Sequence, residues 1–323
     1  MCRYGTFAPM GPATTRLRSA TVLVNPAARG VRKDFDATRL VRYLAKRGLP
    51  ARLVIPASSS EATLEARSAA ERGDDILFVV GGDGSVRDAA LGLAGSATAL
   101  AAVPSGTVNI WAREARIPTG IRKAIDAHLE GQSVHMDLGL AGDHCFLLMA
   151  GVGWDAEVAA HVNPGLKKRL GDVAYMLQAA VDAPRLRTRH VRWATPEGEV
   201  NDELAWMVLG NTRLYGGKIH ITKAAVLDDG LLDVVALCPH GLKETLRVAA
   251  KLTAGNRTDA RMHIFRTPVL ELEAPGIPVQ LDGDPVGETP MRFSVDPGAL
   301  LVSVPAGELA PIFAREHVDR RPT

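Results

Sequence analysis

The stretch from Ile76 to Asp88 contains the residue types with the clearest capacity for chemistry. An apolar run ends in the loop Gly81-Gly82-Asp83-Gly84-Ser85, and a helix is expected to follow. Because glycine has no Cβ, this loop can adopt positive φ, and its N–H groups can approach an anion at the helix N-terminus. A polyphosphate fits such a loop, and Asp83 could orient a hydroxyl group or hold a magnesium ion. The alternative is a tight strand-to-helix turn with an incidental aspartate.

A second loop of similar character, Pro104-Ser105-Gly106-Thr107-Val108-Asn109, lies between a predicted strand at 99–103 and a predicted helix at 110–116. In a parallel sheet both loops would lie at the carboxyl ends of strands, where α/β proteins bind their ligands. Two loops at one edge, each opening a helix, could converge on one polyanion. We interpret the pair as a phosphate site, with two purely structural turns as the alternative.

The elements that must position these loops alternate between strand and helix. The pattern predicts strands at 21–24, 52–55, 76–80 and 99–103, separated by helices at 34–46, 60–72 and one that ends near residue 94. Such alternation predicts a parallel sheet with helices on both faces. After Gly131 many short strands follow closely, including 291–295 and 300–304, with helices only at 170–181 and 242–252. This half is predicted to be largely antiparallel and sandwich-like.

Composition excludes several classes of protein. The net charge of +2 over 323 residues lacks the basic excess expected of a nucleic-acid binder. The three cysteines form no CxxC pair, which indicates a reducing compartment and neither a disulfide framework nor a zinc site, and the histidines show no ligand spacing. No apolar run reaches the roughly 18 residues that span a bilayer, and the N-terminus lacks the apolar block of a secretory signal.

Several motifs occur in one order along the chain. They are Asn25-Pro26 with Gly30, Gly81-Gly82-Asp83-Gly84-Ser85, Pro104-Ser105-Gly106-Thr107-Val108-Asn109, Gly151-Val152-Gly153-Trp154-Asp155-Ala156, Tyr215-Gly216-Gly217, Asp228-Asp229-Gly230-Leu231-Leu232-Asp233 and Asp282-Gly283-Asp284. The ordered set resembles the diacylglycerol kinase catalytic-domain family, which includes bacterial soluble lipid kinases and sphingosine and ceramide kinases. The resemblance covers about 21–305.

The resemblance implies an α/β N-terminal domain with a parallel sheet, followed by a β-rich antiparallel domain that takes the lipid substrate. We therefore expect a flexible leader at 1–20, a nucleotide-binding domain at 21–131, and a lipid-substrate domain at 132–305. The C-terminal end of the lipid-substrate domain is expected to return to the first domain, and 306–323 to form a tail.

Roles for individual residues also follow from the resemblance. It implies ATP contacts at Asn25, Gly81, Gly82, Asp83, Gly84, Ser85, Ser105, Gly106, Thr107 and Asn109. It implies that Asp83, joined by Asp137, serves magnesium at the γ-phosphate, and that Asp229 with the backbone carbonyls of Val226 and Leu231 forms a second, structural metal position. It further implies that Asp284 is the general base and that Asp155 contacts the lipid substrate.

Simpler readings of three of these residues stay open. Asp284 could be a turn residue because Asp282-Gly283 is a good hairpin signal, and the same holds for Asp229-Gly230. Asp155 could be a helix N-cap. The sequence also departs from the family's pattern: Ile110 stands where many bacterial members have Asp, and Asp284 replaces the usual Glu.

We predict an ATP- and magnesium-dependent kinase that phosphorylates a lipid alcohol such as diacylglycerol or a sphingoid base. The alternatives are an enzyme related to NAD kinase and an inactive nucleotide-binding regulator. We expect a cytoplasmic protein that docks at the inner membrane face, does not bind nucleic acid, and has a homodimer as one open oligomeric state. Docking would use a basic patch formed by Lys167, Lys168, Arg169, Arg185, Arg187 and Arg189, for which a solvated basic face is the alternative.

Overall fold

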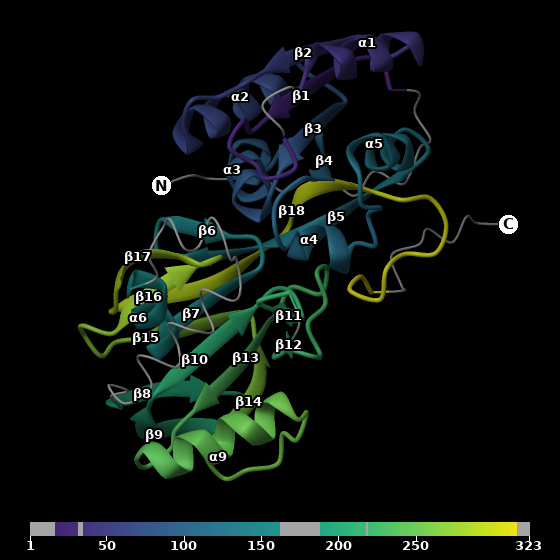
Figure 1. The fold of residues 1–323 in the computed structure, drawn as a ribbon. Helices are drawn as coiled ribbons and strands as arrows, with labels where there is room; N and C mark the ends of the chain where they lie inside the picture. The colour runs from purple at the N-terminus through teal and green to yellow at the C-terminus, as the bar shows by residue number, and fades with distance from the viewer. Residues whose placement is uncertain (1–16, 32–34, 162–187, 218, 315–323) are drawn as a thin grey trace, which may run out of the picture. The chain divides into compact units, whose positions relative to one another are not determined.

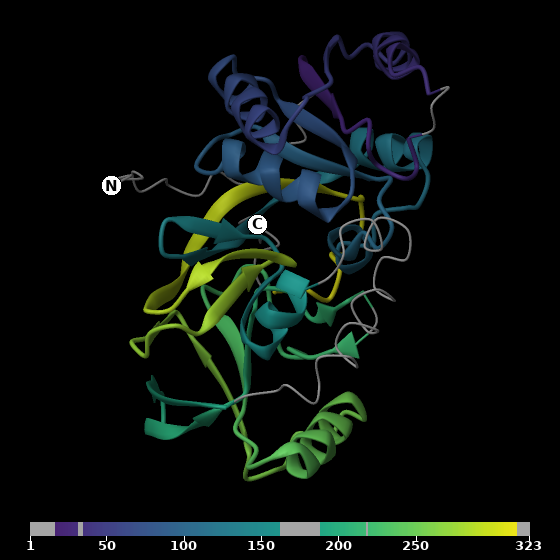
Figure 2. The same ribbon diagram turned by 60° about the vertical axis from the view of Figure 1, so that its left-hand side comes forward.

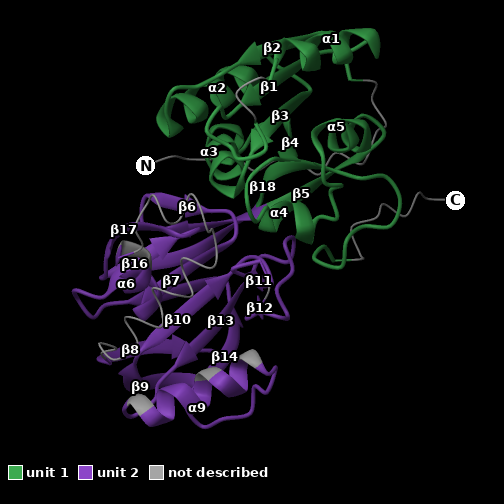
Figure 3. Cartoon of the chain, viewed as in Figure 1, with its two compact units in different colours: residues 1–136, 298–323 green, residues 137–297 purple. Residues whose placement is uncertain are grey.

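The computed structural model describes residues 17–31, 35–161, 188–217 and 219–314 (Figure 1). The chain divides into two compact units, one formed by 1–136 with 298–323 and the other by 137–297 (Figure 3). The sequence predicted a boundary near Gly131 and a second domain up to residue 305, whose C-terminal end returns to the first domain. The divisions fall inside two long strands, β5 (Gln132–Ala141) and β18 (Met291–Val304), so both strands contribute residues to each unit.

The first unit alternates strands and helices, as the apolar periodicity predicted. Its strands are β1 (Ala20–Val24), β2 (Ala51–Val54), β3 (Ile76–Gly81) and β4 (Ala99–Pro104), and its helices are α1 (Thr38–Lys46), α2 (Ser59–Glu71), α3 (Asp83–Leu93), α4 (Ile110–Glu114) and α5 (Ile121–Leu129). Strand β1 pairs in parallel with β2 and β3, and β3 pairs in parallel with β4. β1 and β3 are buried along their whole length, which is typical of a parallel sheet covered on both faces.

Helices α2 and α3 lie side by side in both ribbon views (Figure 1 and Figure 2). Their close approach depends on Gly92, because a Cβ at that position would lie 2.3 Å from the carbonyl oxygen of Thr63. The Thr63 hydroxyl also donates a 2.8 Å hydrogen bond to the carbonyl oxygen of Asp88. This contact fixes the helix that follows the glycine loop.

The larger sheet runs in the order β2-β1-β3-β4-β18-β5-β6, and β15 (Val269–Leu272) pairs antiparallel with β18. Strand β6 spans His144–Phe146. The sequence predicted two short strands where the structure has the single strand β18. Pro297 and Gly298 gave a turn signal inside it, but here they mark a change of partner: residues before them pair with β15, and Val302 pairs in parallel with Leu100 of β4.

The second unit contains a six-stranded antiparallel sheet in the order β14-β13-β10-β7-β16-β17. Its strands are β7 (Met149–Gly153), β10 (Trp206–Gly210), β13 (Leu232–Leu237), β14 (Met262–Thr267), β16 (Pro278–Leu281) and β17 (Asp284–Glu288). Two small hairpins, β8 (Arg189–Thr195) with β9 (Gly198–Leu204) and β11 (Leu214–Tyr215) with β12 (Ile219–His220), form separate sheets. The described helices are α6 (Trp154–His161) and α9 (Leu242–Thr253). The helix predicted at 170–181 lies outside the described residues.

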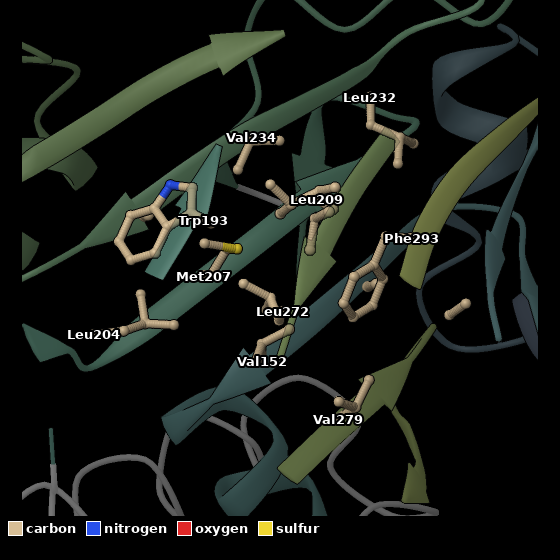
Figure 4. Packing of buried hydrophobic residues seen from close by; sticks show 14 of the residues in the cluster. Val152, Trp193, Leu204, Met207, Leu209, Leu232, Val234, Leu272, Val279 and Phe293 are labelled. Carbon is tan, nitrogen blue, oxygen red and sulfur yellow. The ribbon is translucent and has the colours of Figure 1, made fainter. Parts of the chain in front are cut away.

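The core of this unit combines the six-stranded sheet with the β8–β9 hairpin and parts of β15 and β18. Figure 4 shows Val152, Met207, Leu209 and Val234 facing Leu272 and Phe293, with Trp193 at one side. The parallel α/β sheet and the antiparallel β-rich sheet confirm the predicted fold class. Within the described ranges, no helix has the length and apolar character needed to cross a bilayer.

Candidate functional site

The two predicted phosphate loops meet in the first unit. Strand β3 ends at Gly81 and β4 ends at Pro104, and the pairing register places these two residues opposite each other. The Ser105 N–H donates to the Gly81 carbonyl oxygen at 2.9 Å. A Cβ on Gly106 would lie 2.5 Å from the Cα of Gly82, so the loops can touch only because glycine occupies the contact.

Asp83 ties the first loop to the helix that follows the second. One carboxylate oxygen accepts the Ile110 N–H at 2.9 Å, and the other accepts the Trp111 N–H at 3.0 Å. Burial raises the pKa of Asp83, and these N–H groups and the nearby Arg113 oppose that rise. A carboxylate offers about four lone-pair sites, so two hydrogen bonds leave acceptor capacity for a cation.

The Asn25 loop contacts the same two loops. The Asn25 side-chain amide donates to the Ser85 hydroxyl at 2.7 Å, and the Gly30 N–H donates to the Ser105 carbonyl oxygen at 2.7 Å. Gly81 leaves the room that Ser85 needs, because a Cβ there would lie 2.5 Å from the Ser85 Cβ. The structure therefore brings together the three segments that the resemblance assigned to ATP.

Several groups at this place suit an anion. Helix α3 begins after Gly82 with no side-chain hydrogen bond capping its N-terminus. A Cβ on Gly84 would meet nothing within 4 Å, so the backbone there is open to a ligand. The Ser105 hydroxyl is buried and has no hydrogen-bond partner among the described residues. Unpaired donors at a helix N-terminus are the chemistry that binds phosphate.

Hydrogen bonds within the second loop, between Asn109 and Gly106, hold its shape. Asn109 adopts a left-handed backbone with φ of 54°, a conformation in which Asn is favoured among non-glycine residues. Its side chain accepts the Gly106 N–H at 2.9 Å and donates to the Gly106 carbonyl oxygen at 3.0 Å. Thr107 is exposed between them. The Asn109 side chain thus shapes the loop, and the Thr107 hydroxyl faces solvent.

Asp155 lies in the second unit and is almost fully buried, with 2% of its surface exposed. Its carboxylate accepts hydrogen bonds from the Tyr215 hydroxyl and, at 2.6 Å, from the Gln280 side-chain amide. Burial raises its pKa. Helix α6 begins at Trp154, so Asp155 lies inside the helix instead of capping it. Gly151 makes the space, because a Cβ there would lie 1.8 Å from an Asp155 carboxylate oxygen.

The turn that carries Asp284 is connected to Asp155 through Gln280. The Gln280 side-chain oxygen accepts the Gly283 N–H at 2.6 Å. Asp282 and Gly283 have φ values of 51° and 88°, which fit a two-residue hairpin turn between β16 and β17. Asp284 is the first residue of the edge strand β17 and is partly exposed.

Asp282 has a structural role that the sequence did not reveal. Its carboxylate accepts N–H groups from three consecutive residues, Leu147, Leu148 and Met149, at 2.8 to 3.0 Å. These bonds anchor the turn to the start of β7. The only hint in the sequence concerns the neighbouring residue Gln280. In the alternation Val279-Gln280-Leu281, this polar residue interrupts an apolar strand.

The predicted metal residues of the second unit gather around one turn. The Asp137 carboxylate accepts the Gly230 N–H at 2.6 Å. Asp229 accepts the Leu231 N–H at 3.1 Å and pairs with the Arg266 guanidinium, which also contacts Asp233 at 3.1 Å. The cation next to Asp229 is therefore a side chain that sequence reasoning missed. Val226, whose carbonyl was assigned to the metal, lies just before this turn.

Of the predicted basic patch, only Arg189 at the start of β8 lies within the described residues. The other five residues, Lys167, Lys168, Arg169, Arg185 and Arg187, lie outside them.

Comparisons with known proteins agree with this arrangement. Residues 19–141 match the diacylglycerol kinase catalytic domain, and residues 149–304 match the YegS C-terminal NAD kinase beta sandwich-like domain. A protein named "Probable lipid kinase YegS-like" from Pseudomonas aeruginosa (strain UCBPP-PA14) is 38% identical over 236 residues, covering 72% of this chain and 77% of the relative. One of the same name from Pseudomonas fluorescens Pf-5 is 32% identical over 288 residues, covering 88% and 95%.

Solved structures share the fold. The crystal structure of a diacylglycerol kinase from Bacillus anthracis str. Sterne superposes with a TM-score of 0.67 at 20% identity, covering 90% of this chain and 97% of that chain. A further structure from the same strain gives a TM-score of 0.76 at 22% identity, covering 90% and 96%. At these identities the superpositions show a common fold alone.

Proposed function

From the premise that this chain belongs to the diacylglycerol kinase catalytic-domain family, as a lipid kinase of the YegS-like kind, we propose that it transfers the γ-phosphate of ATP to the hydroxyl group of a lipid alcohol such as diacylglycerol or a sphingoid base. One observation carries the proposal. The Gly81–Ser85 and Ser105–Asn109 loops touch at the carboxyl ends of adjacent parallel strands, beside an uncapped helix N-terminus and an unpaired buried hydroxyl.

Phosphoryl transfer depends mostly on positioning and charge neutralisation, and we assign these tasks to different residues of the two loops. Backbone N–H groups near Gly82 and Gly84, with the Ser105 hydroxyl, would hold the phosphates. Asp83 is the oxygen ligand that suits magnesium at this place, and the ion would supply charge neutralisation at the phosphate oxygens. Asp83 also holds the N-terminus of α4 against the first loop.

We assign proton removal to Asp284 and positioning to Asp155. A carboxylate that reaches the lipid hydroxyl can accept its proton as transfer proceeds, and Asp284 is partly exposed at the hairpin turn. Asp155 is buried and already bound by Tyr215 and Gln280. Through Gln280 it fixes the Gly283 N–H next to Asp284, which favours a positioning role over direct contact with the lipid.

The decisive assay uses purified protein with labelled ATP, magnesium and a panel of diacylglycerol, sphingosine, ceramide and NAD. We expect phosphate on a lipid and none on NAD; phosphorylation of NAD alone would favour the NAD kinase alternative, and ATP binding without any transfer would favour the inactive regulator.

Asp83→Asn cannot accept both N–H groups and displaces α4, so turnover should fall about 100-fold. Asp143→Asn, at an exposed turn, is the matched control and should keep full turnover.

Gly84→Ala separates a ligand site from a structural turn. Alanine is favoured over glycine inside a helix by about 1 kcal/mol, and the new methyl group meets nothing within 4 Å, so the variant should fold at least as stably as the parent. If phosphate approaches this backbone, ATP affinity should nevertheless fall by roughly tenfold, equivalent to about 1.4 kcal/mol. Calorimetric titration with ATP measures it, and unchanged affinity would contradict a phosphate contact at Gly84.

A further inference from the structure

Asp202, Cys238 and His263 bring a carboxylate, a thiol and an imidazole together in the second unit. One potential ligand atom from each lies within 4.8 Å of the other two. Asp202 lies on β9, Cys238 directly follows β13, and His263 lies on β14. None of the three belongs to the motifs assigned to ATP or to the lipid, so the group stands independently of the proposed kinase chemistry.

The fold explains why residues so distant in sequence meet. Strands β13 and β14 are antiparallel neighbours, with Ala236 opposite His263. The Cys238 N–H extends this pairing by donating to the Arg261 carbonyl oxygen at 2.9 Å. The β8–β9 hairpin then supplies Asp202 from a separate two-stranded sheet.

The distances suit a metal better than a direct contact. His263 Nε2 lies 3.7 Å from an Asp202 carboxylate oxygen, which is too long for a hydrogen bond. Ligand atoms around tetrahedral zinc are about 3.3 to 3.6 Å apart, given bond lengths of roughly 2.0 to 2.3 Å, so a bound ion would draw these two atoms slightly closer together. His263 Nε2 is also buried with no hydrogen-bond partner among the described residues, a costly state that a bound cation would relieve.

We infer that Asp202, Cys238 and His263 form a binding site for a zinc-class divalent cation. Thiolate, imidazole and carboxylate are the donors that zinc takes in proteins. Burial raises the pKa of the Cys238 thiol to about 12, with Asp202 adding to the rise, so the metal-free thiol is protonated and binding displaces its proton to solvent.

His240 lies beside the site as a neighbour of Asp202. Its Nε2 is 3.7 Å from the other Asp202 oxygen, and the Arg261 guanidinium donates to its Nδ1 at 3.1 Å. A ring that accepts at Nδ1 carries its neutral-form proton on Nε2, so that nitrogen has no lone pair to offer a metal. We therefore exclude His240 from the ligand set.

Cobalt titration of the chelator-treated, full-length protein tests the site, because a thiolate bound to Co²⁺ gives an ultraviolet charge-transfer band that carboxylates and imidazoles alone do not. We expect one such band per chain, bleached by added Zn²⁺. Cys238→Ala should abolish the band, and His263→Gln should weaken Co²⁺ binding by about 100-fold or more. Cys145→Ala, at the cysteine on β6, is the matched control and should leave the band intact.

Three results would overturn the inference. These are no charge-transfer band in the parent, a band that survives in Cys238→Ala, or equal Co²⁺ affinity in the parent and His263→Gln. If Cys238→Ala fails to fold, as a fully buried position can, His263→Gln and Asp202→Asn decide, because both side chains are partly exposed and the replacements are close in shape. Circular dichroism on each variant shows whether it is folded.

Discussion

At the scale of single residues, backbone N–H groups organise the carboxylates of this protein as much as arginine and lysine do. Asp83 holds two N–H groups of α4, and Asp282 holds three at the start of β7. Hydrogen bonds to an ionised acceptor are roughly twice as strong as neutral ones, so each carboxylate fixes a distant segment firmly. Asp83, which the resemblance assigns to magnesium, thus also determines where α4 begins, and Asp282 fixes the turn that precedes Asp284.

Arg266 instead holds two carboxylates through ion pairs, and it gives the first prediction. Its guanidinium pairs with Asp229 and with Asp233, which is 5% exposed. Arg266→Met would remove the cation that is paired with the buried Asp233, and we expect the free energy of unfolding to fall by about 2 to 3 kcal/mol, measured by urea denaturation. Arg292→Met breaks an exposed pair with Glu271 and serves as the control, with a loss below about 1 kcal/mol.

The same variant tests the second metal position. If Asp229 and the carbonyls of Val226 and Leu231 can hold a divalent cation, removal of Arg266 frees the carboxylate to bind it. Magnesium should then raise the melting temperature of Arg266→Met more than that of the parent. An equal magnesium effect on both proteins would speak against a metal at Asp229.

At the scale of elements, helix α5 is bound to the sheet of the first unit through His128. The ring nitrogens contact the Ala102 carbonyl oxygen of β4 at 2.8 Å and the Ser303 hydroxyl of β18 at 3.0 Å. A carbonyl only accepts, so Nε2 carries the proton and Nδ1 accepts from Ser303. This neutral imidazole is buried among strands, and its burial lowers the pKa of His128 to about 4.

A pH dependence of stability follows. Between about pH 6.5 and 4 the unfolded chain takes up a proton that the folded His128 does not, so stability is complete above the unfolded pKa and is lost as pH falls through this window. The pKa difference corresponds to at most about 3 kcal/mol. Urea denaturation across this range should show a steeper loss for the parent than for His128→Gln. His144→Gln, at the exposed start of β6, should keep the parent's slope, and equal slopes for the parent and His128→Gln would refute the assignment.

How much the sequence could predict differs between elements. Apolar runs that end in loops of small residues located the two loops that touch beyond β3 and β4, and Asp282-Gly283 predicted the hairpin turn that the φ values show. The length of β18 could not be foreseen, because Pro297 reads as a break until its two pairing partners are known. The surroundings of Asp155 could not be foreseen either. Gln280 lies far along the chain, and its burial depends on how β16 pairs with β7.

At the scale of the whole molecule, lipid access is the property that distinguishes this enzyme from a kinase of soluble substrates. Within the described part of the chain, no helix is suited to cross a bilayer, while the expected substrate is a lipid. We expect the protein to dock at anionic head groups, and this expectation rests on the basic residues between 167 and 189. Each such residue near an anionic surface contributes about 1 kcal/mol.

Vesicle sedimentation at low salt tests this expectation. The parent should bind anionic vesicles more strongly than neutral ones, and replacing Lys167, Lys168 and Arg169 together with alanine should weaken anionic binding by roughly 100-fold, about 3 kcal/mol. The matched control replaces three basic residues of α1, Arg39, Arg42 and Lys46, and should bind as the parent does. Equal binding of the parent to neutral and anionic vesicles would contradict the electrostatic version of docking.

Strand β18 lies between β4 and β5 in the sheet order, yet among the described strands it comes last along the chain. On the ribosome, β4 therefore emerges with an open edge that β18 can cover only after the second unit, residues 137–297, has been made. Open strand edges and exposed apolar surface invite aggregation during synthesis. Chains released before β18 is made would keep the edge of β4 open, so the fold couples completion of the first unit's sheet to synthesis of the second unit.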